Sequence, residues 1–195
     1  MDYSNIPEHA TYYAPNRADW RRWLETHHQQ ATSIWLVCYK QKSGTPSLSW
    51  SDAVDEALCF GWIDGTRVSA GEDRFMQYFT RRKPGSIWSK INKDKVSRLI
   101  ETGLMMPAGQ ASIDLAKQNG SWIILDSVEA MIIPDDLQCA LDAHPGATDA
   151  FHKLSKTAKK GMLYQLIAAK RPETRQKRIV GIVEQIQEVI RLKEA

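Results

Sequence analysis

The sequence predicts an α+β fold: a small antiparallel sheet with helices in the N-terminal part, followed by an all-α C-terminal helical bundle. Strand-like runs rich in aromatic and branched residues occur only before about residue 80. From about residue 86 onwards, apolar residues recur at the three- and four-residue spacing of helices. With 195 residues, of which 43% are hydrophobic and 25% charged, the chain has the composition of a globular protein with a sizeable core.

The first three elements are a helix, a buried strand and a second helix. Asn16 has the chemistry of an N-cap, and the helix is expected over about residues 17–29. Residues 34–39 are continuously apolar, which predicts a buried strand, and a turn follows at 42–47. Ser51 is then expected to cap a short helix that Gly61 ends in the left-handed conformation.

Two strand-like runs, 62–68 and 74–80, are joined by five residues and predict a β-hairpin. If the loop is symmetric, paired residue numbers sum to about 142. Alternation of side chains then gives one face with Trp62, Asp64, Tyr78, Thr80 and Arg82, and an opposite, core-facing side with Ile63, Phe75 and Phe79. A slip of one residue in register would exchange the faces of one strand.

The rest of the chain is helical in pattern. Helices are expected over about residues 86–102 and 107–119, and Pro107 suits the start of the second. The period is lost near residues 121–133, which predicts two domains: an α+β domain, 1–125, and a helical domain, 126–195, packed on it. The last helix carries an apolar stripe made of Ile179, Ile182, Val183, Ile186 and Ile190.

The sequence favours a cytoplasmic protein. Its first eight residues are polar, with no basic start and no apolar run, unlike a signal peptide. No stretch reaches the roughly 18 apolar residues needed to cross a bilayer, so no membrane insertion is expected. Cys38, Cys59 and Cys139 are odd in number and lie in apolar segments, as expected for buried free thiols in a reducing compartment.

Positive charge is concentrated in two segments, although the formal net charge is only +3. Residues 81–98 contain seven basic residues and one acidic residue, and residues 152–178 contain nine basic residues and one acidic residue. Clustered positive charge raises the local concentration of anions, so this pattern favours an anionic partner. Solvated helix faces explain the same pattern about as well.

Several short motifs occur along the chain: Glu56–Gly65, Phe79–Lys83 with Trp88, Ser89 and Asn92, Met106–Gly109, and Ala168–Lys170 with Glu173–Arg175 and Arg178–Ile179. They resemble those of the YdeI/OmpD-associated (bacteriocin-protection, OmdA-like) family. They cover most of the chain in the family's order, although the tryptophan usual near the position of Leu166 is absent. The resemblance implies a bacterial protein linked to tolerance of antimicrobial peptides and to a porin, but no reaction and no catalytic residue.

The candidate binding site is a pocket formed by the hairpin and the helix after it, residues 60–92. Asp64 is the candidate catalytic residue, because a carboxylate in a strand beside aromatic rings suits a general base or a ligand anchor. An Asp-Gly turn or a structural ion pair is the alternative. Basic residues leading to a helix start suit a phosphate- or carboxylate-bearing ligand. The candidate residues are Trp62, Asp64, Tyr78, Arg81, Arg82, Lys83, Trp88 and Asn92.

Other chemistries have less support in the sequence. Cys59 lies between apolar residues with no histidine nearby, which favours a buried thiol over a nucleophile. The histidines lack metal-ligand spacing, and no CxxC, P-loop or GxGxxG motif occurs, so no metal and no cofactor are expected. Two alternatives stay open: nucleic-acid binding through basic helices 86–98 and 153–178, and a protein-interaction role in envelope stress tolerance. Neither enzymatic activity nor oligomeric state follows from the sequence.

Overall fold

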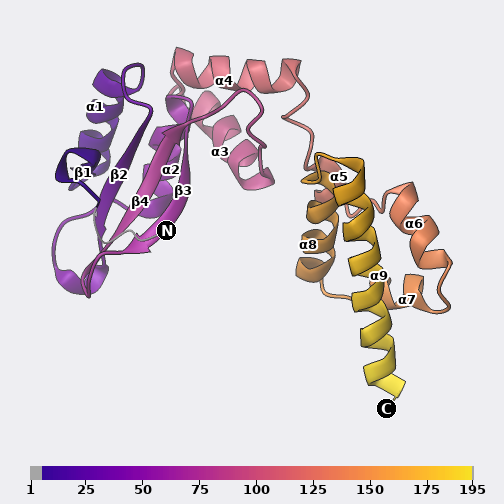
Figure 1. The fold of residues 1–195 in the computed structure, drawn as a ribbon. Helices are drawn as coiled ribbons and strands as arrows, with labels where there is room; N and C mark the ends of the chain where they lie inside the picture. The colour runs from indigo at the N-terminus through magenta and orange to yellow at the C-terminus, as the bar shows by residue number, and fades with distance from the viewer. Residues whose placement is uncertain (1–5, 195) are drawn as a thin grey trace. The chain divides into compact units, whose positions relative to one another are not determined.

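The computed structural model describes residues 6–194, which form two compact units (Figure 1). The first extends to Trp122 and contains a sheet with helices, and the second begins at Ile123 and is helical. The α+β class predicted from the sequence is therefore confirmed. Each unit is described separately below.

The sheet of the first unit has four strands among the described residues, in the order β1-β2-β4-β3. The strands are β1 (Thr11–Tyr13), β2 (Ser33–Tyr39), β3 (Trp62–Ser69) and β4 (Arg74–Arg81). Strand β1 follows a short 3-10 helix, η1 (Glu8–Ala10), and pairs parallel with β2, whereas the other pairings are antiparallel. The sheet is therefore mixed rather than purely antiparallel. The sequence did not predict β1, because three residues are too few to show the alternation of side chains that is typical of a strand.

Two helices, α1 (Arg17–His27) and α2 (Trp50–Cys59), cover one face of the sheet. Trp20 is fully buried, its ring lies 5.3 Å from that of Phe79 on β4, and its indole Nε1 donates to the carbonyl of Ala53 at 3.0 Å. Helix α1 begins at the predicted cap, Asn16. Helix α2 is capped by Ser49, not by the predicted Ser51, so it begins earlier than expected.

Two more helices, α3 (Lys90–Glu101) and α4 (Pro107–Gln118), complete this unit, with a 3-10 turn, η2 (Gln41–Ser43), after β2. Helix α3 starts later than the sequence suggested, because Ser89 caps it. Helix α4 packs closely on the end of α2 at Gly109, where an added Cβ would lie 2.3 Å from the carbonyl oxygen of Cys59. Only glycine permits this approach, which brings the start of α4 to the turn between α2 and β3.

The register of the β3–β4 hairpin differs from the prediction by one residue. Trp62 pairs with Arg81 and Asp64 with Phe79, and a β-bulge then lies between Asp64 and Arg67. The bulge places an extra residue in β3, so the register at the base of the hairpin differs by one residue from that near the loop. Trp62 therefore shares the helix-covered face with Phe79, and both are fully buried. The predicted grouping of Trp62 and Asp64 with Tyr78, Thr80 and Arg82 on one face is wrong.

The second unit is a helical bundle with its own core. Its helices are α5 (Asp126–Glu129), α6 (Asp135–Asp142), α7 (Ala147–His152), α8 (Lys156–Ile167) and α9 (Pro172–Glu194). Helix α9 contributes the predicted stripe to a core with Leu137, Leu141, Phe151, Leu163 and Leu166. Packing of this bundle on the first unit stays a prediction. Over residues 6–194, no helix combines the length and apolar character needed to span a bilayer.

Candidate functional site

A cavity of about 230 Å³ lies at the base of the hairpin. Its walls come from four parts of the first unit: the residues after α1, the turn between α2 and β3, the end of β4, and the start of α4. The lining residues are His28, Gln29, Phe60, Gly61, Arg81, Arg82, Ala108 and Ser112.

The α2–β3 turn brings these parts together. Gly61 adopts a φ of 73°, the left-handed conformation predicted for it, and its carbonyl accepts the backbone N–H of Arg82 at 2.9 Å. A Cβ added at Gly61 would lie 3.0 Å from the carbonyl oxygen of Ala108. The absence of a side chain at this position therefore lets the start of α4 approach the end of β4.

Arg82 is the most unusual side chain of the cavity wall. Its guanidinium lies 3.6 Å from the ring centroid of Trp88, and its Nη1 donates to the carbonyl of Ile87 at 3.3 Å. Its Nε and Nη2 atoms are buried, and neither has a hydrogen-bond partner among the described residues. Burial lowers the pKa of Arg82 to about 10, and the charge of Asp64 opposes the shift. Arg82 is therefore still charged at neutral pH, with two donors left over.

Arg81 and His28 stand beside it. The Nη2 of Arg81 donates to the carbonyls of Gln29 and Ala31, at 3.1 and 2.8 Å, which holds the exposed guanidinium at the cavity. The Nδ1 of His28 lies 2.8 Å from the carbonyl of Leu24, a contact that requires a proton on Nδ1. The carbonyls thus orient both side chains.

The first turn of α4 forms another wall. Met106 occupies the N-cap position without a side-chain hydrogen bond, and Pro107 has no N–H to donate. Unpaired N–H groups at a helix start carry partial positive charge, which favours an anion nearby. One turn further on, the hydroxyl of Ser112 donates to the carbonyl of Gly109 at 2.8 Å. The cavity wall therefore joins an uncapped helix end to two arginines.

Of the residues proposed from the sequence, the structure brings Arg81 and Arg82 to the cavity, with Trp88 beneath Arg82. Lys83 is the next residue along the chain, and its side chain is exposed. Trp62 does not line the cavity, because it is buried in the core, where its Nε1 donates to the carbonyl of His28 at 3.3 Å.

Three more proposed residues lie outside the cavity lining. Tyr78 packs against Trp35 on the other face of the sheet, with ring centroids 4.8 Å apart. Asp64 accepts a hydrogen bond from the Nε1 of Trp50 at 3.1 Å. Asn92 lies in the first turn of α3, where its backbone N–H donates to Ser89. The aromatic candidates Trp62, Tyr78 and Trp88 thus all pack against other parts of the protein.

Among the eight lining residues the sequence named only Arg81 and Arg82 as candidates, while Phe60 and Gly61 fall within the predicted 60–92 stretch. His28, Gln29, Ala108 and Ser112 lie far from the hairpin in the chain. Only Ala108 carried a signal, since it belongs to one of the motifs noted above. The other three are ordinary residues whose importance depends on how the helices pack.

Cys38 and Cys59 do not offer an activated nucleophile. Cys139 is exposed, so the prediction that all three thiols are buried is wrong for this residue. Cys59 is fully buried, and burial raises its pKa to about 11, with the Glu56 carboxylate adding to the shift. Burial likewise raises the pKa of Cys38 to about 11. Thiols of this kind are protonated at neutral pH and inert. Within residues 6–194, no group of three His, Cys, Asp or Glu side chains is arranged to hold a metal ion.

Many basic side chains of the two proposed nucleic-acid-binding segments are engaged in ion pairs. In α3, Lys95 and Arg98 both contact the buried Asp55. In the second unit, Lys160 pairs with Glu129 at 2.6 Å, and Arg175 pairs with Asp136 at 2.6 Å. The charge available to phosphates is therefore lower than the count of basic residues suggests.

Comparison with known families gives two matches. The model described as Domain of unknown function (DUF8412) matches residues 12–112, and the model described as Bacteriocin-protection, YdeI or OmpD-Associated (OmdA) matches residues 130–188. No curated protein and no solved structure matches the chain. The two matched segments fall in the two units of the fold.

Proposed function

Because the chain belongs to the DUF8412 family and carries a bacteriocin-protection, YdeI or OmpD-associated segment, and neither description names a reaction, we propose its function from the cavity itself. The first unit binds a small anionic ligand, bearing a phosphate or a carboxylate, at the base of the β3–β4 hairpin. The protein acts in the cytoplasm, where Cys38 and Cys59 stay reduced.

The observation that carries this proposal is the pair of buried Arg82 nitrogens, Nε and Nη2, that have no hydrogen-bond partner in the described part of the chain. A buried charge is costly unless it is paired and hydrogen-bonded. The Nε and Nη2 atoms have no partner, while an anion with two oxygens can accept from both at once. Arg81 and the start of α4 add positive potential on neighbouring walls.

The volume of the cavity limits the size of the bound group. At about 230 Å³ it is smaller than the ~300–1,000 Å³ typical of sites for drug-sized molecules. A phosphate, a small carboxylate or the phosphate end of a larger molecule fits such a space. Tyr78 packs against Trp35 and Trp88 against Arg82, so neither ring is available to hold a base, and recognition of the anionic group dominates.

The test is calorimetric titration and thermal denaturation of the full chain with phosphate, sulfate, pyrophosphate and small carboxylates. A ligand at 100 times its Kd stabilises the folded state by about 2.7 kcal/mol. Arg82→Met keeps the length of the side chain and its contact with Trp88 but removes the charge, and we expect it to abolish this stabilisation. Arg81→Gln should weaken binding less, because carbonyls already occupy one of its nitrogens.

Arg74→Gln is the matched control. Arg74 lies at the opposite end of β4, is exposed, and donates through Nε to the carbonyl of Ala70 at 3.2 Å. Its loss changes the net charge as much as that of Arg82 but should leave anion binding intact. Equal effects of the two variants would show a non-specific charge effect. The absence of binding at millimolar concentrations of every anion would reject the proposal.

Asp64 lies outside the cavity lining, so it is a candidate for a catalytic role on a part of the bound molecule that extends beyond the cavity. Its charge acts on Arg82, and its carboxylate is held by Trp50. If the bound molecule is a substrate, Asp64→Asn should leave anion binding in place and reduce turnover. Turnover unchanged in Asp64→Asn would exclude it as the general base.

A further inference from the structure

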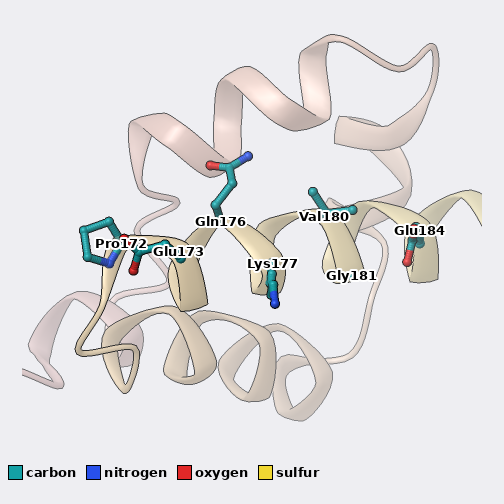
Figure 2. A pocket seen from close by; sticks show the side chains of 7 residues that line it. All are labelled: Pro172, Glu173, Gln176, Lys177, Val180, Gly181 and Glu184. Carbon is teal, nitrogen blue, oxygen red and sulfur yellow. The ribbon is translucent and has the colours of Figure 1, made fainter.

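The outward side of α9 bears two adjoining hollows, which share no residue with the anion cavity. The first is lined by side chains of α9 alone, between Pro172 and Glu184 (Figure 2). The second lies between α9 and the end of α6, beside Ala140 and His144. Gln176, Val180 and Glu184 line both hollows, so together they form one groove along the helix.

The middle of the groove is apolar, and its side chains are small. Val180 has 47% of its surface exposed, although it is an aliphatic residue on a helix whose opposite side builds the core. Gly181 follows it, and a Cβ added there would meet no atom within 4 Å. A second helix can therefore approach the backbone of α9 closely at Gly181.

Opposite charges stand on either side of this centre. Lys177 lies one turn before Val180, and Glu184 lies one turn after it, and both are exposed. Over residues 6–194, neither side chain has an ion-pair partner. They are seven residues apart, about 10.5 Å along a helix, which is too far for them to pair with each other.

We propose that this groove is occupied by α9 of a second copy of the chain. The helices run antiparallel about a two-fold axis that passes between Val180 and Gly181. In that arrangement Lys177 of one protomer faces Glu184 of the partner subunit, and the symmetry repeats the pair. Val180 of each protomer packs over Gly181 of the partner subunit. The groove is therefore complementary to itself in charge and in shape.

The contact is one pair of helices, smaller than a standard protein–protein interface of about 1,600 Å². The dimer should therefore be weak, with a Kd on the order of tens of micromolar. Sedimentation velocity of the full chain across about 1–500 µM measures such an equilibrium directly.

Charge reversal provides the decisive test. Lys177→Glu places four carboxylates around the axis, and Glu184→Lys places four ammonium groups there, so each single variant should weaken dimerisation by tenfold or more. The double variant Lys177→Glu/Glu184→Lys restores opposite charges across the axis and should return the Kd to within about threefold of the original. Circular dichroism of each variant confirms that the bundle is intact.

A size variant and a surface control complete the experiment. Gly181→Leu fills the space over which Val180 packs and should prevent dimerisation. Asp149→Asn, at an exposed acidic residue of α7 that lines neither hollow, should change the Kd by less than threefold. A strictly monomeric chain at about 500 µM would overturn the proposal. A double variant with a Kd of dimerisation as high as those of the single variants would also overturn it.

Discussion

Two clusters of buried charge in the first unit show opposite arrangements. On α2, the residues Asp55 and Glu56 are 4% and 2% exposed, and each carboxylate is held by two cations. At the hairpin base, the guanidinium of Arg82 is buried without any carboxylate in hydrogen-bond contact. The same unit thus contains acidic groups that are neutralised and a basic group that is not.

The difference separates a structural role from a binding role. Glu56 joins α1 to α2 through Arg17 and Arg21, and Asp55 joins α2 to α3 through Lys95 and Arg98. One nitrogen of Arg17 also lacks a partner, but its other two contact carboxylates. Ion pairs of this kind leave no vacancy for a ligand, whereas Arg82 has donors to spare. The comparison can be tested by removing each charge in turn.

Glu56→Gln should have the largest effect, a loss of about 3–5 kcal/mol in the free energy of unfolding. The substitution keeps the shape of the side chain but leaves Arg17 and Arg21 beside a buried neutral amide. Urea denaturation followed by circular dichroism measures the loss. Glu25→Gln is the control, since Glu25 also pairs with Arg21, at 3.4 Å, but is 48% exposed. It should cost less than about 0.5 kcal/mol, and a similar cost for both would mean that burial is not what matters.

Asp55→Asn should cost about 2 kcal/mol, less than Glu56→Gln. Lys95, whose Nζ lies 2.5 Å from Asp55, is mostly buried and loses its ion-pair partner, but it keeps its hydrogen bonds to Ser51. Arg98 is 57% exposed and turns to solvent. Asp94→Asn, in an exposed pair with Lys90 on α3, is the control and should stay within about 0.5 kcal/mol of the original. A larger loss for Asp55 than for Glu56 would contradict this ranking by exposure.

The charge clusters also show how far the sequence predicts this molecule. Helices and strands were found because their apolar periodicity is local, and so were the arginines of the cavity. Asp55 and Glu56 were not singled out, although two acidic residues on the inner side of an apolar helix are a usable signal. Trp62 was assigned to the wrong face because one bulge in β3 shifts the register. The local signal for the bulge is the isolated Gly65 within the strand, which a symmetric pairing ignores. The positions of His28 and Ser112 at the cavity depend on how the helices pack, which the sequence near the hairpin does not predict.

Arg82→Met should change the free energy of unfolding by less than about 1 kcal/mol in the absence of ligand. The variant loses the cation–π contact with Trp88, which contributes about 1–2 kcal/mol to stability. It also no longer buries an unpaired charge, which offsets much of that loss. Denaturation without phosphate measures the stability of the variant itself, and denaturation with phosphate measures the stabilisation by the ligand. Only the stabilisation by phosphate should be lost in the variant. A loss as large as that of Glu56→Gln would show that Arg82 is structural, like the carboxylates of α2.

Asp136→Asn should have the smallest effect, below about 1 kcal/mol, because its pair with Arg175 is exposed to solvent, 43% and 30% for the two side chains. The hydrogen bond from Arg175 lowers the pKa of Asp136 below its usual 3.8. A carboxyl with a lowered folded pKa stabilises the protein above its unfolded pKa, and this contribution is lost as the pH falls through the folded value. The difference in unfolding free energy between Asp136→Asn and the original chain should thus be constant from pH 5 to 8 and shrink below about pH 4. A difference that persisted at pH 2 would mean that Asp136 contributes through packing, and that even this exposed pair behaves like the buried pairs of α2.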